Sequence, residues 1–168
     1  MNKRGTIELS FGMIFSIIIM VAIIGVAVYA ISVFLDIGKT SQLGLFHQQF
    51  QETIDEVWAS SITNKISSFS LPMSIELVCF GSISGNIYNP QYESEFKELK
   101  KYSSSFEKQN ANRFFYPSDK GGEFNYKKIG KIDLSAMNGF DCFKVKSGVL
   151  KIRLIKEEFD ALVKITQE

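Results

Sequence analysis

An uninterrupted apolar run dominates the N-terminal part of this chain. Residues 11–35 read FGMIFSIIIMVAIIGVAVYAISVFL, which is 25 residues with no charge and no proline. As an α-helix rising about 1.5 Å per residue, the run would extend roughly 37 Å, more than the roughly 30 Å hydrocarbon core of a bilayer. The alternative is a buried helix of a soluble core, but a small domain seldom surrounds a helix of this length on every side. The sequence therefore predicts a transmembrane helix over residues 11–35, with the lipid bilayer as its partner.

The charges beside the run predict its orientation. Lys3 and Arg4 precede it, whereas the charges just after it nearly cancel. Basic residues favour the cytoplasmic side, so residues 1–10 are expected in the cytoplasm and residues 36–168 outside it, as in a single-pass membrane protein. The alternative is a cleaved secretory signal that ends at Val28-Tyr29-Ala30. The run is longer than the apolar core of about 7–15 residues that such signals carry, which favours a retained anchor.

The helical pattern continues beyond the apolar run. Between residues 43 and 57, apolar residues recur at spacings of three and four with polar residues between them, a pattern typical of an amphipathic helix. We call these residues the packing stripe: Leu43, Phe46, Phe50, Ile54 and Val57. Residues 36–60 are therefore expected to continue the helix and to lay the packing stripe on a folded domain.

The N-terminal residues resemble a known processing signal. The basic pair and small residue Lys3-Arg4-Gly5, then a short polar stretch with Glu8, then the apolar helix, resemble the class III signal of archaeal type IV pilins and archaellins. The resemblance covers about the first third of the chain. In that family a membrane peptidase cuts after the small residue, here Gly5, and the usual glutamate is fifth after the cut, whereas Glu8 would be third. The resemblance implies a mature protein that begins at Thr6 and assembles through its apolar helix with copies of itself or with other pilin-like subunits.

The rest of the chain, residues 61–168, predicts one small extracytoplasmic α+β domain with a C-terminal antiparallel sheet. Residues 60–70 are polar and serine-rich and are expected to form a connector. Asn89-Pro90 is typical of a helix start, and the apolar face that follows predicts one helix up to about residue 108. The alternating segments are expected to form strands, the last of them in a meander, over residues 74–80, 113–117, 126–134, 140–146, 149–155 and 161–166.

Cys79 and Cys142 are the two cysteines of the chain. A domain outside the cytoplasm is in a compartment where thiols oxidise, so the sequence favours a disulfide between them. Two separate buried thiols are the alternative. Simple alternation places Cys142 on the face of Lys144 and Lys146, so pairing inside the core is expected to need a bulge or twist in that strand.

No motif for catalysis, metal binding or phosphate binding occurs in the sequence, so we expect neither enzymatic activity nor a cofactor. The one histidine, His47, is expected to be exposed on the polar flank of the helix. Of 19 Lys and Arg and 18 Asp and Glu, only Lys3, Arg4 and Glu8 precede the apolar run, so the domain is balanced in charge and no nucleic-acid partner is expected. No small-molecule ligand is inferred either.

One set of lysines is expected to gather on an outer sheet face: Lys127, Lys128, Lys131, Lys144, Lys146 and Lys151. The simplest interpretation is a solvated face, and the alternative is contact with an anionic surface or lipid headgroup.

Taken together, the sequence favours a membrane-anchored structural protein that resembles type IV pilin subunits. A tethered binding domain that does not polymerise is the second hypothesis, and a secreted enzyme is the third.

Overall fold

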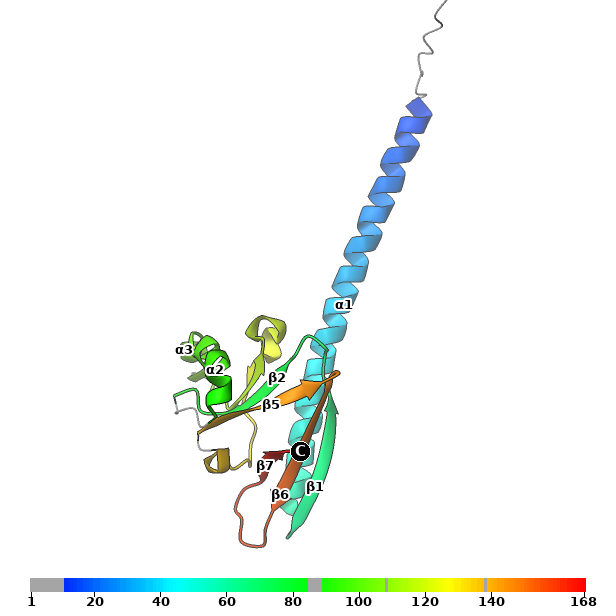
Figure 1. Ribbon diagram of the computed structural model, residues 1–168. Coiled ribbons are helices and arrows are strands. Elements are labelled where there is room, and N and C mark those ends of the chain that lie inside the picture. The colour runs from blue at the N-terminus through cyan, green and yellow to red at the C-terminus, as the bar shows by residue number, and fades with distance from the viewer. Residues whose placement is uncertain (1–10, 85–88, 108, 138) are drawn as a thin grey trace, which may run out of the picture. The chain divides into compact units, whose positions relative to one another are not determined.

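A computed structural model describes residues 11–84, 89–107, 109–137 and 139–168, and it has an α+β fold (Figure 1). The chain divides into two compact units, one ending at Gly38 and the other comprising Lys39–Glu168. A single helix, α1 (Phe11–Ala59), contributes to both units. The apolar run and the packing stripe are thus parts of one helix, as the sequence predicts.

The second unit is built around a seven-stranded sheet in which all paired strands are antiparallel. Its strands are β1 (Thr63–Ser70), β2 (Leu77–Gly81), β3 (Arg113–Tyr116), β4 (Tyr126–Lys127), β5 (Phe140–Lys146), β6 (Val149–Lys156) and β7 (Lys164–Gln167). The strand order is β1-β6-β5-β2-β3-β4, and β7 pairs with β6. Strand β6 therefore joins the first strand of the domain to the last one.

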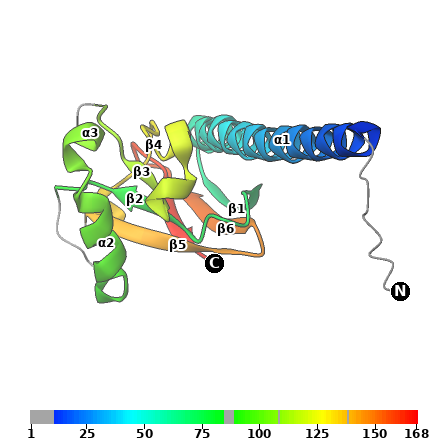
Figure 2. The same ribbon diagram turned by 90° about the horizontal axis from the view of Figure 1, so that it is seen from above.

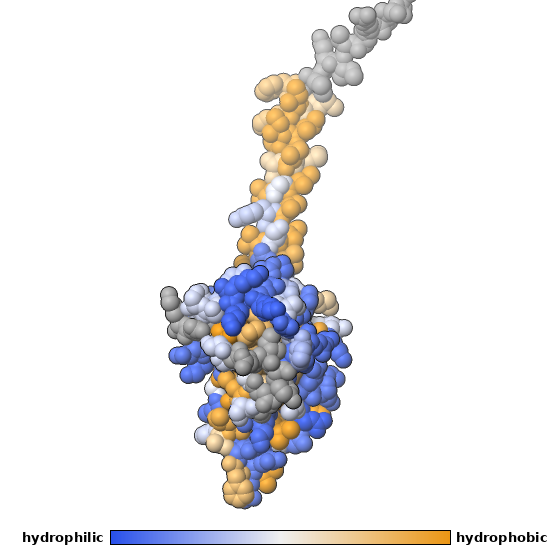
Figure 3. Space-filling model, turned by 60° about the vertical axis from the view of Figure 1, so that its left-hand side comes forward, coloured by the Kyte–Doolittle hydropathy of each residue, from blue (hydrophilic) through white to orange (hydrophobic). Residues whose placement is uncertain are grey.

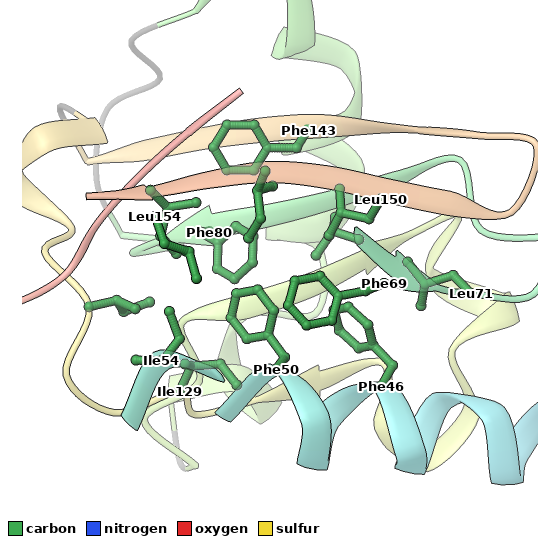
Figure 4. Close-up of a cluster of buried hydrophobic side chains, with 14 of the residues drawn as sticks. Phe46, Phe50, Ile54, Phe69, Leu71, Phe80, Ile129, Phe143, Leu150 and Leu154 are labelled. Carbon is green, nitrogen blue, oxygen red and sulfur yellow. The ribbon is translucent and has the colours of Figure 1, made fainter. Parts of the chain in front are cut away.

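The main hydrophobic core lies between the second half of α1 and one face of the sheet (Figure 4). All five residues of the packing stripe are buried in it, which confirms the predicted amphipathic helix. Phe50 is fully buried, and its ring centroid lies 5.4 Å from that of Phe46, 5.2 Å from Phe69 and 5.3 Å from Phe80. These rings lie at the distances that favour aromatic pairs, so the helix is held to the sheet mainly by aromatic packing.

A second, smaller core covers the opposite face of β2, β3 and β5. It is closed by α2 (Glu93–Lys100), which contributes Phe96 and Leu99, and α3 (Ser103–Glu107) follows. Figure 2 shows both short helices at the end of this unit away from β1 and β6. Because both faces of β2 are covered, all five of its residues are buried.

The disulfide partners lie in this second core. Cys79 of β2 and Cys142 of β5 are opposite each other in the strand register, with their sulfur atoms 2.03 Å apart. The predicted need for a bulge is wrong, because alternation puts both cysteines on the same buried face. Lys144 lies on that face too, opposite Leu77 in the register, and its side chain is exposed.

Several predicted elements differ in the structure. Residues 60–70 are not a connector, because Thr63–Ser70 forms β1 and pairs along its whole length with β6. The strand predicted over 126–134 is reduced to β4, after which Ile132 makes an isolated parallel bridge to Val163. The last three strands, β5, β6 and β7, form the predicted antiparallel meander, but β4 is not part of it, because β2 and β3 lie between β5 and β4.

The predicted single helix after Asn89 is also interrupted. The Asn89 side chain accepts a hydrogen bond from the Gln91 amide as expected, but it caps a short 3-10 turn (Pro90–Tyr92) that precedes α2. A turn at Lys101–Tyr102 then separates α2 from α3, and Tyr102 is exposed rather than part of a continuous apolar face. The predicted strand from residue 74 begins only at Leu77, because Pro72–Ile75 forms a turn closed by the Ile75 amide and the Pro72 carbonyl.

Candidate functional site

The first candidate functional surface is the apolar segment of α1, residues 11–35. Every one of these residues is exposed. One stretch of 18 residues within the helix has a mean hydropathy of 2.9, and none of its residues is buried. Figure 3 shows the concentration of hydrophobic side chains along this part of the helix. By length and composition, this is a helix that can cross a membrane.

The two serine hydroxyls of the segment are satisfied within the helix itself. The Ser16 hydroxyl donates to the Gly12 carbonyl at 2.8 Å, and the Ser32 hydroxyl donates to the Val28 carbonyl at 3.0 Å. In hydrocarbon, an unsatisfied polar group costs several kcal/mol, so these bonds suit an apolar environment. Both serine hydroxyls of the segment are therefore satisfied without water, and Tyr29 adds an exposed phenol hydroxyl.

His47 lies beside the packing stripe and is half-buried, so the prediction of an exposed side chain is wrong. Its Nδ1 atom is buried and has no hydrogen-bond partner in the described chain. Burial lowers the pKa of His47 below its ordinary value of 6.5, and the nearby positive charges of Arg113 and Lys127 lower it further. The imidazole is consequently neutral at pH 7, and nothing among the described residues gives it a catalytic partner.

The sequence analysis also missed the burial of Arg113, which lies near His47. It is 0% exposed, and its guanidinium carbon lies 4.1 Å from the ring centroid of Phe115 and 5.8 Å from that of Phe46. Its Nη1 atom donates to the Phe124 carbonyl at 2.8 Å, whereas Nε and Nη2 have no partner within the described ranges. Burial lowers the pKa of Arg113 to about 9, so the side chain still carries its charge at pH 7.

A signal for this burial was present in the sequence. In a strand, residues two positions apart share a face, so Arg113 lies on the same face as Phe115. The aromatic rings on that face surround the guanidinium and stabilise its charge through their π faces. Arg113 is thus a packing element between the helix and the sheet.

The lysines predicted to share one sheet face fall into separate groups. Lys127 lies over the ring of Phe124 at 5.2 Å, and Lys131 lies over Trp58 at 4.0 Å and pairs with Asp55 at 3.1 Å. The other group lines a surface hollow of about 430 Å3, which we call the basic hollow: Lys144, Lys146, Val149, Lys151, Gln167 and Glu168. The structure therefore brings together three of the six predicted lysines.

The part of the chain that the structure describes contains no group of three or more His, Cys, Asp or Glu residues that could hold a metal ion. The predicted processing residues Lys3, Arg4, Gly5 and Glu8 lie outside the described residues. Two surfaces consequently remain as candidates, the apolar segment and the basic hollow. No family profile, curated protein or solved structure matches the chain.

Proposed function

We propose that this protein is a single-pass membrane-anchored structural subunit with an extracytoplasmic domain, similar to type IV pilin subunits, that associates with copies of itself through its apolar helix. One observation carries the proposal: α1 is a single helix made of two consecutive segments, one exposed and apolar and the other packed against the domain. Residues 11–35 are exposed on all sides, whereas the packing stripe from Leu43 to Val57 is buried in the domain. The domain is thereby joined to its membrane segment by continuous helix.

The chemistry of the exposed segment supports association in lipid. Helices in a bilayer associate by close packing around small residues, and Gly12, Ser16, Ala22 and Gly25 are distributed along this segment. A Cβ atom added at Gly25 would meet nothing within 4 Å, so no contact within the chain occupies the space beside it. That space is open to a neighbouring helix.

The cysteine pair of the domain supports an extracytoplasmic location for the domain. A buried pair of cysteines at bonding distance is stable where thiols oxidise, outside the cytoplasm. Together with the basic residues Lys3 and Arg4 before the apolar run, this favours a cytoplasmic N-terminus and a domain on the outer side. Protease added to intact cells is expected to digest the domain, and protection of the domain until lysis would contradict this orientation.

The decisive experiment is to determine the first residue of the protein purified from its native membrane. Processing of the pilin type predicts Thr6. Replacing Gly5 with Leu is expected to leave a longer, unprocessed product, because a bulky side chain does not fit a cleft that accepts glycine. Thr6→Ser is a matched control that changes the other side of the cut and should be processed. A wild-type protein that begins at Met1 or Asn2 would contradict pilin-type processing and favour a tethered domain.

Assembly is tested separately through Glu8. In a low-dielectric helix bundle, this carboxylate is expected to neutralise the free amine of a neighbouring subunit. Glu8→Gln keeps the size of the side chain and removes its charge, so it should reduce the yield of assembled material without changing processing. Equal assembly of the variant and the wild type would contradict a role for Glu8.

A further inference from the structure

The basic hollow concentrates positive charge on one outer face of the sheet. Lys144 and Lys146 belong to β5, and Lys151 belongs to β6, which follows β5 after the turn at Ser147-Gly148. Val149 contributes an apolar patch to the same surface, and Lys146 and Val149 are partners in the strand register. The hollow is therefore fixed by regular sheet structure, and its lining combines charged side chains with one apolar side chain.

The charges in the hollow are not balanced. In the described chain, no carboxylate lies within ion-pair distance of the three lysine ammonium groups. Glu168 borders the hollow and offsets only part of its charge. Like charges gathered on one surface repel each other, and an anionic partner would relieve that repulsion.

The loop after β6 has the opposite character. Residues 157–160 read Glu-Glu-Phe-Asp, and the side chain of Phe159 is 95% exposed. We call these four residues the acidic loop. Lys164 pairs with Asp160 at 3.0 Å and lies 3.7 Å from Glu157, which leaves the loop with net negative charge.

The acidic loop is held in a defined turn. The Asp160 amide donates to the Glu157 carbonyl at 3.1 Å, and the Glu157 amide donates to Asp160 Oδ2 at 3.0 Å. Trp58 Nε1 also donates to the Ala161 carbonyl at 3.0 Å, which ties the next residue to the end of α1. A large aromatic side chain presented by an ordered turn is the kind of group that contributes most to protein interfaces.

The two surfaces cannot meet within one chain. Glu157 directly follows β6 and comes six residues after Lys151, a separation of roughly 20 Å at about 3.3 Å per residue of extended chain. The strand between them is paired with β1 along its length and keeps them apart. The acidic loop and the basic hollow can therefore contact each other only when they belong to two different molecules.

We infer that the acidic loop of one copy docks into the basic hollow of a second copy. The carboxylates of Glu157 and Glu158 lie against the lysines of the hollow, and the Phe159 ring covers Val149. Because the two surfaces are different and lie at opposite ends of β6, the contact is heterologous and leaves one free surface at each end. Such contacts generate rings or open filaments. The inference rests on the proposed self-association and assigns to it a contact between the domains.

Cysteine cross-linking in the native membrane tests this contact. One full-length copy carries Lys146→Cys with one affinity tag, and a co-expressed copy carries Glu158→Cys with a second tag. The native cysteines are buried and paired, so they do not contribute. Mild oxidation is expected to give a product that carries both tags. Ser94→Cys, at an exposed position of α2, is the matched control and should give no product with Glu158→Cys.

Charge reversal then tests the electrostatics. Adding Lys144→Glu and Lys151→Glu to the copy with Lys146→Cys should lower the cross-linked yield at least tenfold. Adding Glu157→Lys to the other copy should restore much of it. A yield that is unchanged by the reversal would overturn the inference, and so would a product of equal yield with the control.

A second set of variants separates this contact from the proposed helix association. Single cysteines are placed in turn at residues 17–24 of the apolar segment, which covers two turns of the helix. If some of these cross-link while the pair at Lys146 and Glu158 does not, docking is wrong and the proposed function stands. If only the pair at Lys146 and Glu158 cross-links, docking is supported and association through the helix is wrong. If neither cross-links, both are wrong.

Discussion

Cys79 and Cys142 face each other across β2 and β5, on the face of the sheet opposite to the one that packs against α1. The neighbouring residues in the two strands, Phe80 and Phe143, belong to the main core, with ring centroids 5.7 Å apart. The same two strands therefore connect two cores, one through a covalent bond and the other through aromatic contact. A change at the cysteine pair is expected to affect the attachment of α2 more than that of α1.

The first prediction concerns the contribution of this pair to stability. The two residues are 63 positions apart, and closing a loop of this length is worth on the order of 4 kcal/mol in the chain-entropy treatment. The double variant Cys79→Ala, Cys142→Ala should therefore lower the free energy of unfolding by about 4 kcal/mol. Urea denaturation in detergent micelles, followed through the single tryptophan, Trp58, measures it. Two free thiols per chain in the denatured, unreduced wild type would contradict the pairing.

The second prediction compares two positions of α1 within the domain. Phe50 is fully buried among aromatic rings, so Phe50→Ala should cost about 3–5 kcal/mol through lost burial and the cavity left behind. Leu45 is 54% exposed on the same helix, so Leu45→Ala should cost less than about 1 kcal/mol. The same urea titration applies. Equal losses at the two positions would contradict the assigned face of the helix.

The third prediction concerns the end of β2. Gly81 has a φ of +137°, and a Cβ atom there would lie 2.2 Å from the Gly139 carbonyl oxygen. Gly81→Ala should therefore destabilise the domain by several times the roughly 1 kcal/mol that a positive φ alone costs. Gly122 has a φ of +51° and open space around it, so Gly122→Ala is the matched control for the backbone effect. Similar midpoints for the two variants would show that the close approach to Gly139 is absent.

The fourth prediction is a dependence on pH through His47. Its pKa is lowered in the folded protein by burial and then by Arg113 and Lys127, so below pH 6.5 the unfolded chain binds more protons than the folded one. Stability from this group is present above pH 6.5 and is lost as the pH falls through the folded pKa. His47→Gln should remove this part of the pH dependence between pH 7 and pH 5. Because the chain has one histidine, its imidazole resonance gives the folded pKa directly, and a value at or above 6.5 would contradict the burial.

The fifth prediction separates the charge of Arg113 from its volume. Arg113→Met keeps a long apolar side chain between Phe46 and Phe115 and removes a buried charge, which is often neutral or stabilising. The Phe124 carbonyl loses its donor, so we expect a net change within about 2 kcal/mol of the wild type. Arg113→Ala leaves a cavity as well and should cost about 3 kcal/mol or more. A methionine variant as unstable as the alanine variant would show that the charge itself holds this region together.

The helices of this protein were largely predictable from sequence because their signals are local. The apolar run and the packing stripe are periodic over many turns, and both lie in α1 with nearly the expected bounds. The Asn89 cap and the ion pair between Glu93 and Lys97, at 2.7 Å, were also readable from short spacings. Such features depend on residues three or four positions apart, so one sequence contains all the information needed.

The sheet was harder to predict because its pairing is not local. Strand β1 has one residue in the core, Phe69, and its other residues are polar or exposed. Its partner β6 supplies the apolar face of this pair through Leu150, Ile152 and Leu154, so β1 is a strand because of a partner distant in sequence. The same reason explains why the strand predicted over residues 126–134 is reduced to β4, because β3 is available as a partner only at its start and only Ile132 bridges to Val163 further on.

The candidate surfaces were predictable to different degrees. The exposure of the apolar segment follows from its composition. The basic hollow required the turn at Ser147-Gly148, which brings β6 back beside β5 and so selects three lysines from the six expected. Strand alternation places Arg113 on the face of Phe115, but its contact with Phe46 of α1 depends on tertiary packing, which no spacing within either element reveals.

The pairing of β1 with β6 has a consequence for biosynthesis. Thr63 and Lys156 are register partners separated by most of the domain's sequence, so the main core cannot close until the ribosome has made β6. The packing stripe of α1 emerges early and stays uncovered during elongation, because the sheet that buries it includes pairings between strands distant in sequence. Domains of this kind fold slowly and expose apolar surface while they do so. In the proposed membrane-anchored protein, insertion of the N-terminal helix can therefore precede folding of the domain, and a nascent chain arrested before β6 is expected to have its anchor in place and no core.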